Sequence, residues 1–338
     1  MPLAERREVI LKTIIRGYIA QAVPVASKAI ADRYGLKVSP ATIRNDMAYL
    51  EQEGYIMRPH SSAGSIPTDK AYRYYVASIS EDIGLPPVER YLVYQLYQET
   101  KEEMEQWLKL AATWLARFVR NVAVITSPKA ALCRLKYLDL VVLQDFMALL
   151  VLVLYEAKVR RQVLPFDRKV SQDELTKLAN KLSSIYAGKT SSEILASESE
   201  LSPEEEQVSG YVAKMMAEEE KLEYGKLYLE GLRLMLSQPE FANSPRILNT
   251  LEALEEENWL RNIFCQKLGK GEVKIIIGEE NPEPALQDLS LIISRYGIPD
   301  KTSGIVGVIG PKRMDYARAM SSLNCLSTLL SNSIAEYI

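Results

Sequence analysis

The sequence predicts an α+β protein of several domains, and three observations carry that prediction. A short helix, a tight connection and a capped amphipathic helix fill residues 27–53. Three β-rich runs lie together over residues 135–166, and three more strands followed by a helix close the chain over residues 272–337. Strands and helices that are grouped in this way are typical of the α+β class.

The N-terminal region is organised around the helix that begins after Ser39. The Ser39 side chain can cap this helix by accepting a backbone N–H, and Pro40 suits its first position, where a backbone donor would be unpaired anyway. Gly54 favours a stop at the other end. Apolar residues recur at i, i+4 and i+7, which places them on one buried face: Ile43, Met47 and Leu50.

The opposite face of this helix is narrow and carries residue types that read DNA bases. Ala41, Asn45 and Ala48 face away from the core, with Thr42 and Arg44 beside them. Asn can form two hydrogen bonds with adenine and Arg two with guanine, while small alanines allow close approach and contact thymine methyl groups. Any amphipathic helix has some polar residues on its outer face, so this helix alone favours the ordinary interpretation.

The flanking segments favour DNA binding. A short helix over residues 27–34 and a tight connection over residues 35–38 complete a helix-turn-helix. Residues 55–59 and 65–67 can form two strands around the turn-forming letters H-S-S-A-G, as in the wing of a winged helix. We expect Thr42, Arg44 and Asn45 to read base edges. The other candidate DNA-binding residues are Lys28, for which a solvated lysine is an equal alternative, and Ser39, Ala41, Arg58, His60 and Ser62.

The letters S-P-A-T-I-R-N-D-M-A-Y-L-E-Q-E-G-Y-I and P-H-S-S-A-G-S-I-P-T-D-K resemble the N-terminal domain of the heat-inducible transcription repressor HrcA family. That resemblance implies a winged helix that binds an inverted-repeat operator upstream of chaperone operons, in a repressor kept active by a GroEL-type chaperonin. The sequence departs from the family pattern at Ser65, where the family usually has Arg, and at Ala71, where it usually has Gly. Loss of a wing-tip cation is expected to weaken a phosphate or minor-groove contact.

Charge divides the chain into a basic beginning and an acidic remainder. Residues 1–75 hold eleven Lys and Arg against seven Asp and Glu, a net charge of +4, and the chain totals of 41 and 44 leave 30 against 37, a net charge of −7, for the rest. Because attraction to phosphates supplies most non-specific DNA affinity, a basic module on an acidic body can orient the protein on a duplex.

The composition, 47% hydrophobic over 338 residues, is sufficient for two or three domain cores. No apolar segment follows Met1, and the longest apolar run, residues 140–155, is interrupted by Gln144 and Asp145. We therefore expect a cytoplasmic protein without a membrane partner. Three distant cysteines form neither a disulfide framework nor a C-x-x-C pair: Cys133, Cys265 and Cys325.

Further elements are predicted in chain order. Residues 5–22 open as a helix with apolar positions at Val9, Ile10, Ile14 and Ile19. The prolines at 86 and 87 mark a domain boundary. A single long helix then covers residues 88–120, and the three strands of residues 135–166 form an antiparallel meander whose middle strand is covered on both faces. Helices follow this meander, the first capped by the S-x-x-E box of Ser171 and Glu174.

Two later stretches resemble the same family: S-G-I-V-G-V-I-G-P-K-R-M-D-Y at 303–316 and L-E-G-L-R-L-M-L-S-Q-P-E-F at 229–241. The resemblance implies a GAF-like α+β domain with an inserted, mainly helical dimerising domain, in a homodimer. The division expected from it is a DNA-binding domain at residues 1–80, a GAF-like domain at 88–170 and 225–338, and the inserted domain at 171–224.

No pattern in the sequence indicates catalysis, a metal or a cofactor. His60 is the only histidine, which excludes sites that need two. Gly304, Gly307 and Gly310 lack the spacing of a dinucleotide-binding loop and are interpreted as strand glycines. We expect no cofactor and no enzymatic activity.

The leading hypothesis is a dimeric repressor of chaperone genes that heat inactivates. An alternative is a metabolite-sensing regulator whose GAF-like domain binds a ligand, which ligand-induced release of operator DNA would favour. A third hypothesis, an enzyme tethered to DNA that uses Asp139, Asp145 or Glu279 with a metal, has no paired-carboxylate spacing to support it. Catalytic turnover in a fragment lacking residues 1–80 would favour that one.

Overall fold

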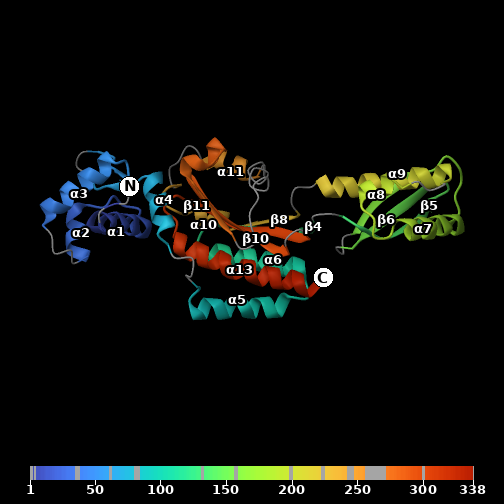
Figure 1. Ribbon diagram of the computed structural model, residues 1–338, viewed down its shortest axis with the longest axis horizontal. Helices are drawn as coiled ribbons and strands as arrows, with labels where there is room; N and C mark the ends of the chain where they lie inside the picture. Colours follow the sequence, from blue (N-terminus) through green and yellow to red (C-terminus); the bar gives the residue numbers. More distant parts are fainter. Residues whose placement is uncertain are drawn as a thin grey trace. The chain divides into compact units, whose positions relative to one another are not determined.

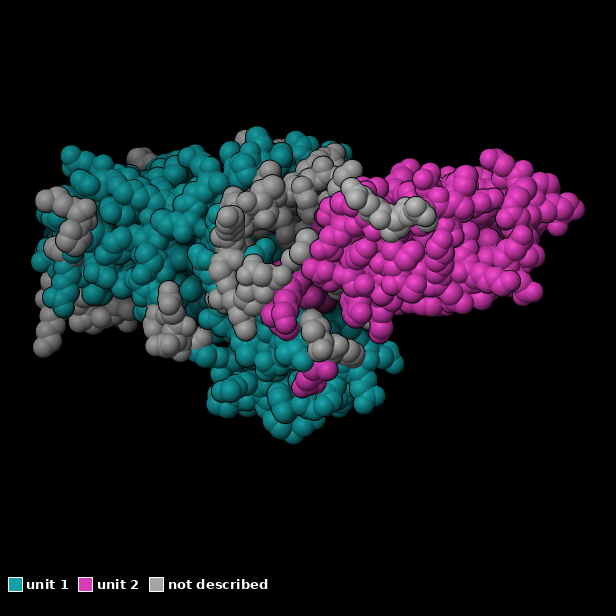
Figure 2. Space-filling view, turned by 45° about the vertical axis from the view of Figure 1, so that its right-hand side comes forward, with its two compact units in different colours: residues 1–127, 226–297, 304–335 teal, residues 128–225, 298–303, 336–338 magenta. Residues whose placement is uncertain are grey.

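The computed structural model describes residues 3, 5–34, 39–60, 63–79, 84–130, 133–155, 159–197, 201–221, 225–241, 247–255, 272–298 and 301–337. The chain divides into two compact units (Figures 1 and 2). The first contains residues 1–127, 226–297 and 304–335, and the second contains residues 128–225, 298–303 and 336–338. Among the described residues, no helix is long and apolar enough to cross a membrane.

The first unit begins with a winged-helix region, in the predicted order. Its helices are α1 (Glu5–Gln21), α2 (Ser27–Tyr34), α3 (Pro40–Gln52) and α4 (Asp69–Ala77), and its wing is the antiparallel pair β1 (Ile56–Met57) and β2 (Ile66–Pro67). Ile43, Met47 and Leu50 are buried as predicted. In α1 the prediction is wrong at Val9, which is 42% exposed, because the buried face contains Leu11 and Ile15 instead.

The rest of the first unit is a sheet region. Its strands follow the order β8 (Leu227–Glu230), β3 (Val122–Thr126), β11 (Thr302–Pro311), β10 (Leu289–Ile298) and β9 (Val273–Ile277). The start of β11, residues 302 and 303, pairs with β4 (Lys129–Ala130), and this pairing belongs to the second unit. The predicted strand glycines therefore lie in β11. A Cβ atom at Gly304 would lie 2.5 Å from the Tyr296 ring, so close packing requires glycine there.

Helices cover this sheet region. Tyr316 at the start of α13 (Tyr316–Tyr337) hydrogen-bonds to Ser290 on β10 through its hydroxyl, at 2.9 Å. Helix α6 (Met104–Val119) packs on β3 and β8, with α5 (Pro87–Thr100) packed against it on the outside (Figure 1). Short elements complete the region: α10 (Leu232–Leu236), α11 (Ile247–Glu255), and the 3₁₀ turns η1 (Gly278–Glu280) and η2 (Pro284–Leu286).

The predicted single helix over residues 88–120 is wrong, because the structure breaks it at residues 101–103 into α5 and α6. The break lets the two helices pack against each other, which one straight helix could not do. Tyr97 and Trp107 meet at this contact with ring centroids 5.4 Å apart, and both are buried. No glycine or proline lies at the break, so the sequence gives no local signal for it.

The second unit contains the meander as a separate three-stranded antiparallel sheet: β5 (Leu135–Gln144), β6 (Met147–Leu154) and β7 (Val159–Pro165). Helices α7 (Gln172–Tyr186), α8 (Ser191–Leu195) and α9 (Pro203–Lys221) belong to the same unit. The expected division differs here, because residues 135–165 pack with these helices in one core and not with the larger sheet. The compact unit that contains them begins at residue 128, whereas the insertion was expected from residue 171.

Two further expectations concern this unit. The capping box is present: Ser171 N–H donates to Glu174, and this hydrogen bond is the main reason why the pKa of Glu174 falls to about 2.

The expectation that the middle strand is covered on both faces is wrong for the chain by itself. Along β6, buried residues alternate with partly exposed ones, so only one face is fully covered.

Candidate nucleic-acid interface

The outer stripe of α3 is free for contact, as predicted. Ala41, Arg44, Asn45 and Ala48 are exposed on one side of the helix, and Thr42 is half-buried beside them. The four exposed positions recur at the i, i+3, i+4 and i+7 spacing of a single helix face. The stripe can therefore enter a major groove without rearrangement of the helix that carries it.

The start of this helix is held by the predicted cap. Ser39 Oγ accepts from the Thr42 backbone N–H at 3.2 Å and lies 3.0 Å from Thr42 Oγ1. The Ser39 hydroxyl is thus already engaged in capping. Its backbone has the extended conformation usual at an N-cap, with φ of −67° and ψ of 151°.

The beginning of α2 borders the stripe. Arg44 Nε donates to Ser27 Oγ at 3.4 Å, which holds the guanidinium beside the first turn of α2. Lys28, the next residue, is exposed. The structure therefore brings the predicted base-reading arginine close to a segment whose predicted role is to contact phosphates.

The candidate DNA-binding residues of the wing differ from one another in their contacts. Arg58 pairs with Glu51 on α3 at 3.1 Å, and each side chain is 36% exposed. His60 is exposed, and its carbonyl accepts from Ala63 N–H at 2.9 Å in the turn. Ser62 lies outside the described residues. Arg58 must therefore exchange or share its carboxylate partner to contact a phosphate.

The structure corrects the expectation for Ser65. Its side chain is fully buried, so this position is not an exposed wing tip. Its backbone forms an isolated bridge with Val25 through two hydrogen bonds of 2.9 Å. Gly64 must be glycine here, since a Cβ atom would lie 2.6 Å from the backbone of Pro24 and Val25. This bridge fixes the base of the wing to the connection between α1 and α2.

Sequence reasoning missed the ion pairs that hold α3 in place. Asp46 is 3% exposed and accepts from Arg6 at 2.7 and 3.2 Å and from Arg7 at 3.1 Å. The hydrogen bond from Arg6 is the main cause of a lowered Asp46 pKa, and the same contact raises the pKa of Arg6. The sequence signal was an acidic residue on the buried face, between Ile43 and Met47, which requires a partner.

Comparisons with known proteins identify the same helix-turn-helix in the sequence. A DeoR-like helix-turn-helix domain profile matches residues 13–69, and the profile of the HrcA protein C terminal domain matches residues 105–320. A solved structure described as a hypothetical protein covers the whole chain with a TM-score of 0.62 at 22% identity, which supports the fold alone.

Named relatives cover nearly the whole chain. A heat-inducible transcription repressor HrcA of Dehalococcoides mccartyi is 42% identical over 334 residues, which are 99% of this chain and 96% of that one. One of Chloroflexus aggregans is 37% identical over 352 residues, covering 99% and 94% of the two chains. The chain therefore belongs to the family of the heat-inducible transcription repressor HrcA.

Proposed function

We propose that this protein represses heat-shock and chaperone operons by binding an inverted-repeat operator as a homodimer. The observation that carries the proposal is the exposed Ala41, Arg44 and Asn45 stripe on a capped helix within a helix-turn-helix. Thr42, Arg44 and Asn45 read base edges in the major groove, and Ala41 contacts a thymine methyl group. The DNA backbone is held by the remaining predicted residues: Lys28, Ser39, Arg58, His60 and Ser62.

The homodimer is supported by an uncovered apolar face in the second unit. On the meander face opposite α7, one cross-strand row joins Tyr137, Val153 and Val159, and another joins three more apolar residues, Val141, Leu149 and Val163. Of these six, Tyr137, Val141, Val159 and Val163 are 41–61% exposed. Contiguous exposed apolar surface of this kind marks an interaction site.

The charges on the same face are self-complementary. Between the two apolar rows, the register places Asp139 on β5, Val151 on β6 and Arg161 on β7 in one row. In a two-fold contact each surface meets a copy of itself, so Asp139 of one copy can face Arg161 of the other. We therefore propose that the dimer contact lies on the meander strands, whereas the resemblance implied a contact through residues 171–224.

We also propose that heat inactivates the repressor and that a GroEL-type chaperonin keeps it active. The proposal rests on family membership, and a loss of fold or of dimer contacts on warming needs no ligand. The metabolite-sensing alternative gains no support from the relatives.

The DNA-tethered enzyme gains no support either. Asp145 forms an ion pair with Lys169 at 2.7 Å, and Asp139 belongs to a different unit from Glu279. Across the described residues, no group of three or more His, Cys, Asp or Glu is arranged to hold a metal ion.

The proposed function is tested by titrating the protein against the inverted-repeat operator and a scrambled duplex, at two salt concentrations, with and without chaperonin. We expect tight binding that is selective for the operator and improved by chaperonin. Equal and salt-sensitive binding to both duplexes would contradict the proposal, because it would mean that the basic module only contacts phosphates.

A further inference from the structure

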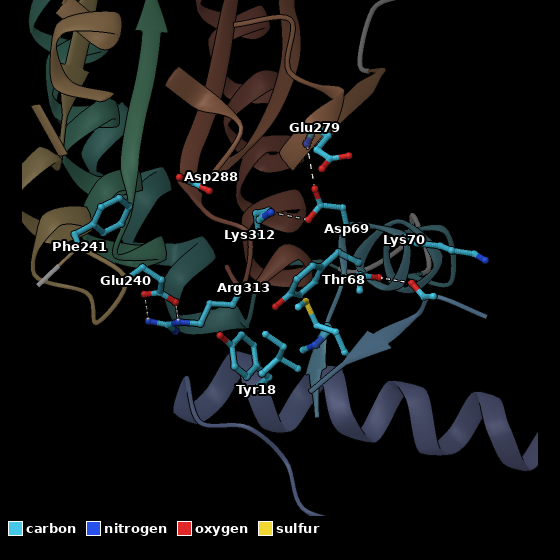
Figure 3. A pocket seen from close by; sticks show the side chains of 15 residues that line it. Tyr18, Thr68, Asp69, Lys70, Glu240, Phe241, Glu279, Asp288, Lys312 and Arg313 are labelled. Atoms are coloured by element: carbon cyan, nitrogen blue, oxygen red, sulfur yellow. Dashed lines mark hydrogen bonds and ion pairs between the residues drawn. The ribbon is translucent and has the colours of Figure 1, made fainter. Parts of the chain in front are cut away.

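Two later segments, residues 229–241 and 303–316, also resemble the family but have no role in the proposed contact with DNA. Within the first unit, these segments meet the winged-helix region. Lys312 and Arg313 follow β11, and Glu240 lies in the loop after α10. Figure 3 shows Lys312 directed at Asp69 on α4, and Arg313 lying between Glu240 and Tyr18 on α1. These residues line a cleft of about 660 Å³. We call this contact between the winged-helix region and the sheet region the joint.

Arg313 forms the first link across the joint. Its side chain is 14% exposed, and its guanidinium pairs with both carboxylate oxygens of Glu240. The same group donates to Gln238 Oε1 and to the Ile19 carbonyl, each at 3.1 Å. Ile19 lies in the last turn of α1, where carbonyls lack partners within the helix and a cation is favoured by the helix dipole. Arg313 therefore connects the last turn of α1 to the loop of residues 238–240 by hydrogen bonds.

That loop is itself fixed to the sheet region. Gln238 Nε2 donates to the Arg120 carbonyl at 2.9 Å and to Asn121 Oδ1 at 2.8 Å, at the end of α6. Asn121 is buried and donates in turn to the Val119 carbonyl at 3.0 Å. A displacement of the 238–240 loop would therefore disturb α6, so Arg313 connects α1 to a rigid support.

Asp69, the first residue of α4, forms the second link. Its Oδ1 lies 2.8 Å from Lys312 Nζ, and its Oδ2 accepts from the Glu279 backbone N–H at 3.1 Å (Figure 3). The carboxylate rests directly on Gly278, where an added Cβ atom would lie 1.8 Å from Oδ2. The positive φ of Gly278, 53°, also favours glycine. The turn after β9 is thus shaped to receive this carboxylate.

Arg73, one turn further along α4, forms the third link. It donates to Glu280 Oε1 at 2.8 Å and to the Ile275 carbonyl on β9 at 2.7 Å. Glu280 is held in place by the Ile277 backbone N–H at 2.9 Å. Both partners of this pair are about two-fifths exposed, so water competes for the contact.

An aromatic contact lies beside these polar links. The rings of Tyr72 on α4 and Tyr316 on α13 lie 5.9 Å apart and are both buried. An aromatic contact beside an open cleft has little directional preference, whereas hydrogen bonds and ion pairs are directional. The three links therefore determine the angle between the two regions.

The joint is connected mechanically to the reading helix without touching its outer stripe. Thr68, which caps α4, donates to the Gly54 and Tyr55 carbonyls at 2.7 and 3.0 Å, just beyond the end of α3. A rotation of α4 on the sheet region would therefore carry α3 with it. None of the joint residues lies on the α3 stripe itself.

From this geometry we infer that Arg313, Asp69 and Arg73 are positioning residues for operator recognition. They hold the winged helix at a fixed angle on the sheet region, so that the two reading helices of a dimer match the spacing of an inverted repeat. This inference rests on the proposed dimeric function. Once one winged helix of the dimer has bound its half-site, the second binds at an effective concentration set by the geometry of the dimer. A joint that does not fix the angle lowers this effective concentration.

The test uses double variants that remove a link without changing the net charge: Asp69→Asn with Lys312→Gln, and Arg73→Gln with Glu280→Gln. Charge neutrality matters because the loss of one cation would itself weaken DNA binding. The matched control is Glu8→Gln with Lys12→Gln, which removes a 2.7 Å ion pair within α1. Each protein is titrated with a duplex carrying one half-site, with the full inverted repeat, and with repeats of altered spacing. Thermal unfolding checks that the variants are folded.

We expect half-site affinity to stay within about twofold of the parent chain, while affinity for the full repeat falls about tenfold and becomes less sensitive to spacing. The control should match the parent on every duplex. Folded link variants that bind the full repeat like the parent, or that lose half-site and full-repeat affinity equally, would overturn the inference. If the parent itself shows no preference for the full repeat over a half-site, the dimeric function fails first and the inference fails with it.

Discussion

The carboxylate of Asp46 on α3 lies 2.7 Å from Arg6 Nε on α1, although the Asp46 side chain is only 4% exposed. A buried carboxylate without a cation would be costly, so the pair fixes α3 on α1. Arg7 contributes a further hydrogen bond at 3.1 Å, and its guanidinium also stacks on the Tyr49 ring, 3.6 Å from the centroid. The orientation of the exposed stripe on α3, for which we propose contact with DNA, thus depends on charges on the inner side of the helix.

Replacement of Asp46 by Asn is expected to destabilise the protein by about 1–3 kcal/mol at neutral pH, because hydrogen bonds to a charged group are lost. The folded-state pKa of Asp46 lies below its ordinary value of 3.8. The stabilisation is therefore present above that value and is lost as pH falls through the lower folded-state pKa. Urea unfolding of both proteins should show a difference in stability that shrinks in acid. A difference that is constant from neutral pH to below pH 3 would contradict this explanation.

Replacement of Arg44 by Ala is expected to lower operator affinity by about 1–3 kcal/mol while affecting a scrambled duplex much less, because the proposed function assigns Arg44 a contact with a base edge. Lys28→Ala is the comparison variant, because the phosphate contact that we propose for Lys28 carries no sequence information. That variant should weaken binding to both duplexes and reduce the salt dependence by about one unit of slope. Equal losses on both duplexes for Arg44→Ala would show that it contacts only the backbone.

The sequence was sufficient to predict elements whose signals are local. The cap at Ser39, the apolar spacing that follows it and the stop at Gly54 lie within one short segment, and α3 forms there. Contacts between distant segments could not be predicted in this way. Arg6 and Asp46 are 40 positions apart, and Arg313 and Ile19 are 294 apart, so only the folded chain brings them together.

The meander shows how a correct pattern led to a wrong expectation. Residues 147–154 are apolar without alternation, which predicted a strand covered on both faces. Within one chain, α7 and its neighbours cover one face only. The pattern is explained if a second copy covers the other face, so the apolar run indicates the proposed assembly more than the fold of the single chain.

The wing offers a test that is independent of DNA. Gly64→Ala would place a Cβ atom 2.6 Å from the backbone of Pro24 and Val25, which cannot move away as a side-chain end can. We expect a loss of about 1–3 kcal/mol in stability, as for other overpacked sites. Gly210→Ala is the matched control, since nothing lies within 4 Å of its added Cβ atom inside α9. It should stabilise the protein by about 0.5–1 kcal/mol. Equal thermal midpoints for Gly64→Ala and the parent would show that the wing is not held at its base.

The proposed dimer face makes the last prediction. Val141 and Val163 lie in one cross-strand row with Leu149 between them, and both valines are more than two-fifths exposed. A charge placed in this row would be desolvated on assembly, and its two-fold copy would add repulsion. Val141→Asp with Val163→Asp should therefore yield a folded monomer in sedimentation experiments. Leu195→Asp, at a residue that is 72% exposed on α8, adds a charge to the same unit outside this row and should leave the oligomeric state unchanged. If the valine variant remains dimeric, the contact lies elsewhere. If it is monomeric, it should also lose the preference for an inverted repeat over a half-site, because both half-sites are then bound independently.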